Sequence, residues 1–437
     1  MLPFLLDFCY LALLLFLAPR LLWQRWKKGK YRAGWNQKWF GELPERTTNS
    51  SPRVWLHAVS VGEILQLRQI VSRLLHARPD LDLLVTTTTE TGFAVAKEKL
   101  KGCEVAFFPL DFRRTVRQAL KRVQPDLIVL VELELWPNFV LEVSRQRIPL
   151  MLINGRLSPR SFRGYRWIRP LVSRLLQGVN PIAVQSEEYR DRFLALGANS
   201  DSLHVTGSIK FDGVEGDREN RRTQELREWL RITSEQIVFV AGSTQEPEEA
   251  YAIETYLALR QKFPGLRLIL VPRHPDRADF VLSLLKARQL PVAQRSLAGI
   301  SLPAAADPVG LLDTVGELEA CWGLADIAFV GGSFTNRGGQ NMIEPAAYGA
   351  AVCYGPNTSN FRQIVELLEQ RHASERVLSS IELEEFVLRM AKNRREALAM
   401  GTRARELVRE QQGATAQTVE LILDSLQGLP LPKSSAA

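Results

Sequence analysis

The sequence alternates strand-like and helix-like segments twice along its length, and this alternation restricts the possible folds more than any other feature. A first series of short apolar runs occupies residues 54–58, 81–87, 104–108, 127–132, 150–154, 182–185 and 203–205. A second series occupies residues 237–241, 266–271, 309–312, 327–330 and 351–354. Amphipathic helical patterns lie between most of these runs. Short β-rich runs that alternate with helices predict parallel sheets covered on both faces.

The chain has 437 residues, which is too long for a single hydrophobic core and predicts two domains. The stretch 206–216 closes the first series, contains three glycines and precedes a charged helical pattern, so we place the domain boundary there. The predicted organisation is an N-terminal Rossmann-like domain over residues 25–212, a C-terminal one over residues 213–426 and a disordered tail over residues 427–437. We expect these two α/β domains to face a central cleft.

The first 24 residues have a different composition from the rest. Residues 2–18 are almost wholly apolar, interrupted by Pro3 and Asp7, and basic residues crowd the stretch 25–32. This length is at the lower limit for a membrane span, and the basic charge follows the apolar run instead of preceding it, which argues against a cleaved signal. By the positive-inside rule we expect an uncleaved anchor helix over residues 1–24, with the body of the protein in the cytoplasm. A helix lying in the membrane interface stays open as an alternative, because Asp7 is costly deep in hydrocarbon.

Composition argues against several classes of partner and site. The 56 basic and 48 acidic residues give a net charge of +8, which suits anionic partners, but no nucleic-acid-binding motif accompanies it, so we expect no nucleic acid. The four cysteines lie far apart without a CxxC pair, which indicates neither a disulfide framework nor a metal site. None of the five histidines pair at ligand spacing. We expect no metal and no cofactor, and the sequence does not indicate the oligomeric state.

The motif HAVSVGE, residues 57–63, directly follows an apolar strand pattern and opens a helical one. Such a junction places loop side chains and free helix N–H groups at the carboxyl edge of a sheet, where open α/β folds bind ligands. Glu63 stands at the start of the helix, next to Gly62. Its carboxylate suits a general base, and it equally suits an ordinary first-turn acid favoured by the helix dipole. Position alone leaves both interpretations open.

Three glycine-containing stretches in the second half have the composition of phosphate-binding loops. Residues 242–244 and 331–333 each follow a strand pattern, and residues 338–341 lead into a helical pattern that contains Glu344. Glycines let the backbone approach a ligand, and free amides at a helix start can receive phosphate oxygens. Together the three stretches predict a nucleotide or sugar-phosphate site in the second domain, although none matches the P-loop or dinucleotide fingerprint. Arg273, at another strand end, can add a positive charge to this site.

Ten motifs of this chain, taken in order, resemble those of the 3-deoxy-D-manno-octulosonic acid (Kdo) transferases of lipopolysaccharide assembly. They are HAVSVGE (57–63), TTTTETG (86–92), VELELWPN (131–138), INGRLSPRSFRGY (153–165), GSIKFD (207–212), AGST (241–244), VPRHP (271–275), DTVGEL (313–318), GGSF (331–334) and GGQNMIEPAAYG (338–349). The resemblance covers nearly the whole chain. It implies the α/β architecture called GT-B, with two Rossmann-like domains preceded by an N-terminal membrane-anchor helix.

The resemblance also implies a reaction and the residues that perform it. Members of this family transfer Kdo from CMP-Kdo to a lipid A precursor (lipid IVA) at the inner membrane. An inverting transfer needs a base for the acceptor hydroxyl and positive charge or amide donors for the departing phosphate. By resemblance Glu63 is the base, and Glu132 and Lys210 steady the transition state. Glu134 is a near competitor for the role of Glu132.

For the donor nucleotide, the family pattern places contacts on three segments of the second domain. These contacts are Pro272, Arg273, Val315, Gly316, Glu317, Asn341, Met342, Ile343 and Glu344. Two other functions stay open. One is a GT-B transferase that uses a UDP-sugar on a lipid acceptor, and the other is a non-catalytic, membrane-tethered nucleotide-binding protein.

A basic stretch in the first domain allows two interpretations. It contains Arg156, Arg160, Arg163, Arg166, Arg169 and Arg174, interleaved with aromatic and aliphatic residues. A solvated helix face is the ordinary interpretation of such a pattern. An anchored domain and a phosphorylated glycolipid acceptor instead favour contact with the membrane or with lipid phosphates.

Overall fold

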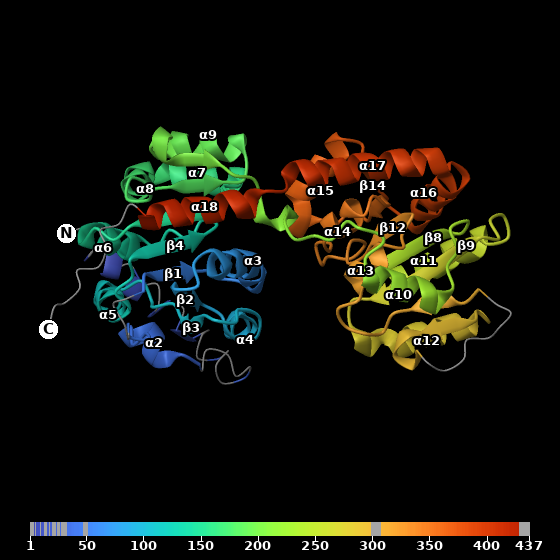
Figure 1. Ribbon diagram of the computed structural model, residues 1–437, viewed down its shortest axis with the longest axis horizontal. Coiled ribbons are helices and arrows are strands. Elements are labelled where there is room, and N and C mark those ends of the chain that lie inside the picture. Colours follow the sequence, from blue (N-terminus) through green and yellow to red (C-terminus); the bar gives the residue numbers. More distant parts are fainter. Residues whose placement is uncertain are drawn as a thin grey trace. The chain divides into compact units, whose positions relative to one another are not determined.

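The structure is a computed structural model, and it divides the chain into two compact units (Figure 1). It describes residues 33–46, 51–298 and 307–427, and from the N-terminal stretch residues 4, 6–8, 10–12, 15, 16, 18, 19, 23 and 27. Unit 1 comprises Met1–Asp212 and Gln412–Ala437, and unit 2 comprises Gly213–Gln411. Of the predicted disordered tail, only Gln427 lies among the described residues, at the end of a helix.

Unit 1 contains a seven-stranded sheet in the order β3-β2-β1-β4-β5-β6-β7, in which every pairing is parallel. Its strands are β1 (Arg53–His57), β2 (Asp82–Thr87), β3 (Glu104–Phe107), β4 (Leu127–Val131), β5 (Leu150–Gly155), β6 (Ile182–Val184) and β7 (Leu203–Val205). Its helices are α2 (Trp35–Phe40), α3 (Val61–Ala77), α4 (Glu90–Lys99), α5 (Arg113–Val123), α6 (Pro137–Gln146), α7 (Pro159–Trp167), α8 (Arg169–Leu176), α9 (Glu187–Leu196) and α18 (Ala414–Gln427), with 3₁₀ turns at Ser200–Ser202 and Ile209–Phe211. The strand order reverses between β1 and β4, so the loops after these two strands open onto one crevice at the carboxyl edge.

Helices cover both faces of this sheet, which explains why its central strands are apolar throughout. On β1, Trp55 packs in the cluster that includes α5, α6, α8 and α9, whereas Val54 and Leu56 pack with α3 and α18. Successive side chains of a strand point to opposite faces. A strand buried on both faces therefore has no polar alternation, as the sequence LIVLV of β4 illustrates.

The C-terminal helix α18 belongs to unit 1, which differs from the prediction that the second domain extends to residue 426. In Figure 1, α18 lies beside α3. Val419, Ile422 and Leu426 of α18 enter the core of unit 1. The carboxylate of Asp212 accepts a hydrogen bond from the backbone N–H of Gly413 at 2.7 Å. The sequence shows that one face of this helix is apolar, but it does not show which of the two units that face packs against.

Unit 2 contains a second seven-stranded parallel sheet, in the order β10-β11-β9-β8-β12-β13-β14. Its strands are β8 (Ile237–Thr244), β9 (Leu266–Pro272), β10 (Val292–Gln294), β11 (Val309–Leu311), β12 (Ile327–Val330), β13 (Ala351–Tyr354) and β14 (Ser374–Arg376). Its helices are α10 (Arg221–Leu230), α11 (Glu248–Leu259), α12 (Ala278–Ala287), α13 (Leu318–Trp322), α14 (Ile343–Ala347), α15 (Arg362–Gln370), α16 (Ser380–Lys392) and α17 (Arg394–Gln411), with 3₁₀ turns at Pro275–Arg277, Arg295–Leu297 and Ser359–Phe361. Here the order reverses between β8 and β12, and the predicted α/β class with two parallel sheets is confirmed.

The predicted anchor over residues 1–24 lies partly outside the described residues. Within the part of the chain that is described, no helix has both the length and the apolar character needed to cross a membrane. The carboxylate of Asp7 accepts hydrogen bonds from the backbone N–H of Arg113 at 3.1 Å and from the side-chain amide of Asn138 at 3.0 Å. The ring of Tyr10 meets Phe112 edge-on at 6.2 Å between centroids. Burying the Asp7 carboxylate in membrane hydrocarbon would cost free energy. In this structure the carboxylate has hydrogen-bond partners in unit 1 instead.

Candidate active site

Glu63 lies in the first turn of α3, beside the crevice between β1 and β4. Ser60 caps this helix: its hydroxyl accepts from the N–H of Glu63 at 3.3 Å and donates to the Glu63 carboxylate at 2.8 Å. The other carboxylate oxygen accepts from the N–H of Val59 at 2.8 Å. These hydrogen bonds cap the helix, so Glu63 has the ordinary role of a first-turn acid. This role does not by itself decide whether Glu63 is also a base. Burial raises the pKa of Glu63 and the nearby Glu132 adds to the rise, while the hydrogen bonds oppose it.

Glu132 follows β4 directly and lies across the same crevice. Its backbone has φ of 60°, a left-handed conformation that is uncommon for a residue with a side chain. The side chain is buried and forms a 2.7 Å ion pair with the Nε of Arg156. Backbone strain of this kind is often located at functional sites, where surrounding contacts enforce it.

Lys210 lies on the 3₁₀ turn that follows β7, and Asn154 holds this turn in place. The side-chain oxygen of Asn154 accepts from the N–H of Ile209 at 3.3 Å, and its amide donates to Gln66 on α3 at 2.7 Å. Burial lowers the pKa of the Lys210 ammonium and Arg156 lowers it further, whereas the carboxylates of Glu132 and Glu63 raise it. The structure thus brings together all three residues that the resemblance assigns to catalysis.

Glu134 joins the same cluster from the loop after β4. Burial raises its pKa to about 7, and the carboxylates of Glu63 and Glu132 add to this rise. Among the two competing acids, Glu132 is the one that pairs with Arg156 and acts on the Lys210 ammonium. Three carboxyl groups and two cations therefore share one edge of the unit 1 sheet, an arrangement that can both accept a proton and stabilise an anion.

Two members of this cluster were not predicted from the sequence. Arg156 was assigned only to a basic surface, although it pairs with Glu132 at the sheet edge. Asn154 was part of a family motif without a role, yet it adopts a φ of 52° at the end of β5 and positions the turn that carries Lys210. One feature of the sequence could have pointed to Asn154, because an asparagine stands at the end of a buried apolar strand. Asparagine tolerates a left-handed backbone better than most residues.

In unit 2, the charge of Arg273 acts on the carboxyl group of Glu344. Arg273 follows β9, where its N–H donates to the carbonyl of Thr244 at 2.9 Å and its side chain is exposed. Burial raises the pKa of Glu344 to about 7, and the positive charge of Arg273 is among the influences that lower it. The side-chain amide of Asn341 donates to Glu344 at 3.0 Å, while its oxygen accepts from the N–H of Ile343 at 3.1 Å. An exposed cation after β9 and a half-buried acid on α14 therefore interact electrostatically in unit 2.

The other residues assigned to the nucleotide have varied surroundings. Pro272 is buried at the end of β9, and Val315 and Gly316 are exposed in the loop after β11. Glu317 is held by Arg295, which donates from Nε at 3.0 Å and from its terminal nitrogen at 2.8 Å. The side chains of Met342 and Ile343 belong to the core, at 0% and 2% exposure, so only their backbone can contact a ligand.

The glycine stretch 331–333 is not a free phosphate loop, contrary to the prediction. The carboxylate of Glu248, at the start of α11, accepts from the backbone N–H groups of Gly332, Ser333 and Phe334 at 2.7, 2.8 and 2.9 Å. It also accepts from the N–H of Gln245 at 2.9 Å. An internal carboxylate thus occupies the position that the glycines prepare for an anion. The prediction of a phosphate at this stretch is therefore wrong, because the acceptor is a carboxylate of the same chain.

Comparison with known proteins gives the family. The sequence profile of the family described as 3-deoxy-D-manno-octulosonic-acid transferase (kdotransferase) matches residues 32–213. A 3-deoxy-D-manno-octulosonic acid transferase from Haemophilus influenzae is 32% identical over 376 residues, which cover 86% of this chain and 87% of that protein. The chain belongs to the Kdo transferase family. It is therefore a glycosyltransferase, and the resemblance seen in its motifs is confirmed.

The similarity extends over both units. The 3-deoxy-D-manno-octulosonic acid transferase of Bordetella pertussis is 33% identical over 428 residues, covering 94% of this chain and 97% of that protein. Among solved structures, a UDP-GlcNAc 2-epimerase from Neisseria meningitidis has a TM-score of 0.57 at 14% identity, covering 85% of this chain and 100% of that one. At this identity the likeness shows the fold alone, an α/β fold of the GT-B kind with two parallel sheets.

Proposed function

We propose that this Kdo transferase moves Kdo from CMP-Kdo to a lipid A precursor in lipopolysaccharide core synthesis, with inversion at the anomeric carbon. The observation that carries the proposal is the cluster at the carboxyl edge of unit 1. There a buried acid with a raised pKa, Glu63, shares its surroundings with Glu132 and with a half-buried cation, Lys210. Membership of the family indicates that the sugar is Kdo. The cluster provides the proton acceptor and the cation that the transfer needs.

In the proposed step, an acceptor hydroxyl oxygen attacks the anomeric carbon of Kdo. The bond from that carbon to the phosphate oxygen breaks, CMP leaves with the electron pair, and the hydroxyl proton passes to the Glu63 carboxylate. A carboxylate whose pKa is raised by burial accepts a proton more readily at neutral pH. Lys210, held opposite Glu132, stabilises the negative charge of the Kdo carboxylate or of the departing phosphate.

Unit 2 is the proposed donor site. Arg273 is exposed and suited to a bidentate contact with the CMP phosphate. Glu344 accepts hydrogen bonds from the ribose hydroxyls when it is ionised. The remaining proposed contacts are Pro272, Val315, Gly316, Glu317, Asn341, Met342 and Ile343, the last two through their backbone. The chemistry so written uses no metal and no cofactor.

The proposed location is the cytoplasmic side of the inner membrane, through the N-terminal anchor and a basic surface on α7 and α8. All six arginines of that surface are exposed: Arg156, Arg160, Arg163, Arg166, Arg169 and Arg174. Beside them, Trp167 is 90% and Ile168 49% exposed. Exposed tryptophan among arginines is typical of surfaces that insert at the level of lipid headgroups.

The direct test is to incubate the full chain with CMP-Kdo and lipid IVA and to measure the mass of the glycolipid product. We expect a mass increase by one or more Kdo units. Transfer from a UDP-sugar instead of CMP-Kdo would favour the alternative GT-B transferase. Binding of CMP without any transfer would favour the non-catalytic alternative.

The role of Glu63 needs a variant that keeps its capping function. Glu63→Gln retains an oxygen for the N–H of Val59 but loses the proton acceptor, so we expect CMP binding to persist and transfer to fall by about 10² to 10⁴. The chain contains a matched control. On α16, Ser379 caps the helix, and Glu382 accepts from the N–H of Leu378 at 2.8 Å, as Glu63 does from Val59. Glu382→Gln should leave transfer unchanged, and equal activity of the two variants would refute the assignment of Glu63 as base.

A further inference from the structure

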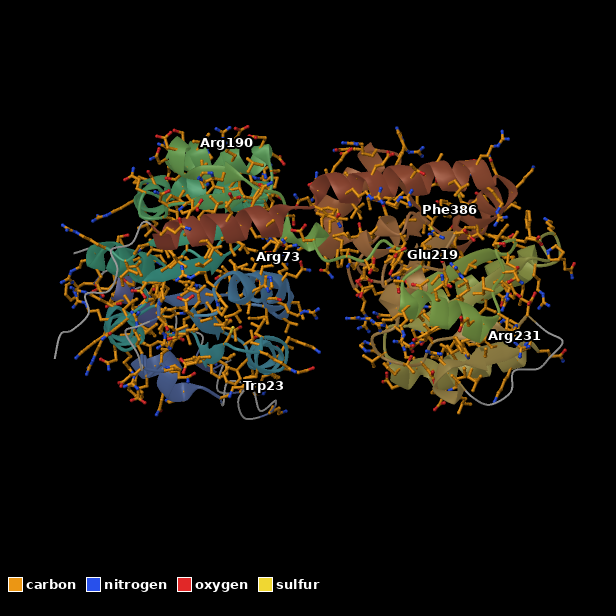
Figure 2. The ribbon with its side chains drawn as sticks, viewed as in Figure 1. Trp23, Arg73, Arg190, Glu219, Arg231 and Phe386 are labelled. Carbon is orange, nitrogen blue, oxygen red and sulfur yellow. The ribbon has the colours of Figure 1, made fainter. Side chains whose placement is uncertain are left out.

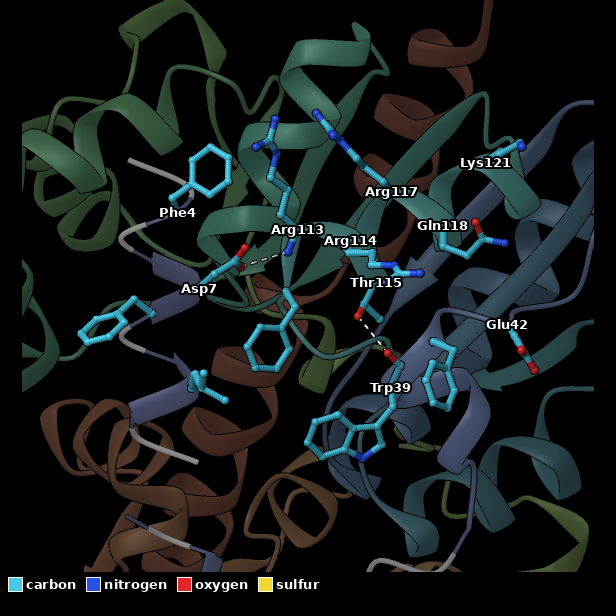
Figure 3. Close-up of a pocket in the computed structure, with 14 residues that line it drawn as sticks. Phe4, Asp7, Trp39, Glu42, Arg113, Arg114, Thr115, Arg117, Gln118 and Lys121 are labelled. Carbon is cyan, nitrogen blue, oxygen red and sulfur yellow. Dashed lines mark hydrogen bonds between the residues drawn. The ribbon is translucent and has the colours of Figure 1, made fainter. Parts of the chain in front are cut away.

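A large pocket of unit 1 lies among the N-terminal residues, α2 and α5, away from the Glu63 cluster (Figure 3). Its volume is about 1180 Å³. None of Glu63, Glu132, Arg156 and Lys210 lines it. Helix α5 covers the face of the sheet opposite to α3, the helix that begins beside Glu63. The proposed transfer reaction therefore leaves this pocket without a role.

One side of the pocket is cationic. Helix α5 buries Val116, Ala119, Leu120 and Val123 in the core, and its basic residues project from the remaining surface, as Figure 3 shows. Arg113, Arg114, Arg117 and Lys121 line the pocket. Arg117 pairs with Glu142 at 2.9 Å. Among the described residues, Arg114 and Lys121 form no ion pair and both are exposed, so their charges are available to a ligand.

The other side of the pocket is apolar and aromatic. Phe4, Phe8 and Leu11 are 66%, 70% and 51% exposed, and their spacing of four and three residues places them on one face of a helix. Trp39 of α2 stacks on Phe112 with ring centroids 6.3 Å apart. All five side chains line the pocket. A surface that contacts lipid is expected to combine several exposed apolar side chains with neighbouring cations, as this pocket does.

The N-terminal residues are held in this position by hydrogen bonds. Asp7, between Phe4 and Phe8, accepts from the N–H of Arg113 (Figure 3) and from the side-chain amide of Asn138. The guanidinium of Arg113 in turn lies 4.9 Å from the centroid of the Phe4 ring. The cationic and the apolar sides are therefore fixed to each other through Asp7 and Arg113.

We propose that this pocket binds one anionic phospholipid of the bilayer. Its phosphate lies against Arg114 and Lys121, and one acyl chain lies along Phe4, Phe8 and Trp39. A free phosphate would leave the apolar side unused. A zwitterionic lipid would bring its own positive charge beside Arg114 and Lys121, which form no ion pair with Glu42, the exposed acid of the lining. The inference rests on the proposed membrane location of the enzyme but not on the sugar that it transfers. Binding there would hold unit 1 at the bilayer in a fixed orientation.

The test uses the full chain in detergent micelles and a phosphatidylglycerol with brominated acyl chains, which quench nearby tryptophans. We expect saturable quenching that is absent with brominated phosphatidylcholine and strongly reduced in the double variant Trp35→Phe, Trp39→Phe, because Trp39 lines the pocket and the centroid of the Trp35 ring lies 5.2 Å from that of Trp39. The double variant Arg114→Gln, Lys121→Gln should weaken binding about thirtyfold, the effect of two cations near an anionic surface. The control double variant Arg73→Gln, Lys101→Gln removes the same charge from exposed residues that do not line the pocket, and it should bind normally; Arg73 is labelled in Figure 2.

Four results would overturn the proposal: equal quenching by both lipids, undiminished quenching in the Trp35→Phe, Trp39→Phe variant, equal weakening in the two charge variants, or displacement of phosphatidylglycerol by lipid IVA. The last result would make the acceptor glycolipid the occupant. Transfer from CMP-Kdo, measured in detergent without phosphatidylglycerol, should be the same in both charge variants and the wild type. Absence of transfer from the wild type would refute the proposed function, and the quenching experiment would still test the lipid site by itself.

Discussion

The carboxylate of Glu248 provides a quantitative test of how the glycine stretch 331–333 is used. One of its oxygens accepts from the N–H groups of Gln245 and Gly332, and the other accepts from those of Ser333 and Phe334. The side chain is fully buried. Burial raises the pKa of Glu248, and the four hydrogen bonds oppose that rise. The loop and the start of α11 are thus joined by a single side chain.

The substitution Glu248→Gln changes two of these four contacts. The oxygen of a glutamine can serve one pair of N–H groups, but its NH₂ group faces the other pair as a donor. Two buried backbone donors then lack an acceptor, at a cost of about 1–3 kcal/mol each. We expect a total loss of about 4 kcal/mol from the stability of this loop. Glu249→Gln is the control: Glu249 is equally buried, but it pairs with Arg277 through both oxygens and accepts no hydrogen bond from residues 332–334, so this loop should keep its stability.

Amide hydrogen exchange of the peptide that contains residues 332–334 measures this loss directly. About 4 kcal/mol corresponds to exchange roughly a thousandfold faster in Glu248→Gln than in the wild type. Exchange less than about tenfold faster, with other segments unchanged, would refute the structural role of Glu248. If exchange stayed slow and CMP binding was lost, the original interpretation of this stretch as a phosphate loop would be restored.

Two further predictions concern the two sites. Asn154→Gly keeps the left-handed backbone but removes the acceptor for the N–H of Ile209. In steady-state transfer assays we therefore expect kcat to fall about tenfold or more, with the KM for CMP-Kdo unchanged. A change in KM alone would contradict this prediction. Burial raises the pKa of Glu344 to about 7, and ligand hydroxyls bind its ionised form, so CMP affinity measured by calorimetry should rise between about pH 6 and about pH 8. Glu344→Gln should keep only the smaller rise that the second ionisation of the CMP phosphate causes at a pKa of about 6, and an identical pH profile in the variant would exclude Glu344 from the site.

The sequence predicted most of the fold because central strands of a parallel sheet are apolar on both faces. Every strand predicted from apolar runs is present, whereas β10 and β14 were missed. These two strands lie at the edges of the unit 2 sheet and contain polar residues, such as Gln294 and Glu375. An edge strand has one paired neighbour and little buried surface, so its sequence carries a weak pattern. The placement of α18 was wrong for another reason, because an apolar helix face does not specify which core it covers.

For the candidate site, the sequence indicated which residues carry charge but not how they pair. Glu63, Glu132 and Lys210 were identified through family motifs, and their convergence at one sheet edge follows from parallel strands ending together. The pairing of Arg156 with Glu132 depends on the side-chain conformation of an exposed arginine. Local sequence does not determine that conformation. The glycine stretch 331–333 failed as a prediction because composition cannot distinguish an external phosphate from a carboxylate of the same chain.

Glu63 and Glu248 occupy equivalent places in the two units, and their difference bears on catalysis. Each begins the helix that follows the first strand of its sheet, next to the point where strand order reverses. A carboxylate has about four lone-pair positions for hydrogen bonds. Glu248 uses four, all with backbone donors, whereas the Glu63 carboxylate accepts from the N–H of Val59 and from Ser60 and has fewer partners. The same element in the same topology thus gives a fully hydrogen-bonded structural anion in unit 2. In unit 1 it gives a carboxylate that its neighbours satisfy less completely and whose pKa is raised by burial.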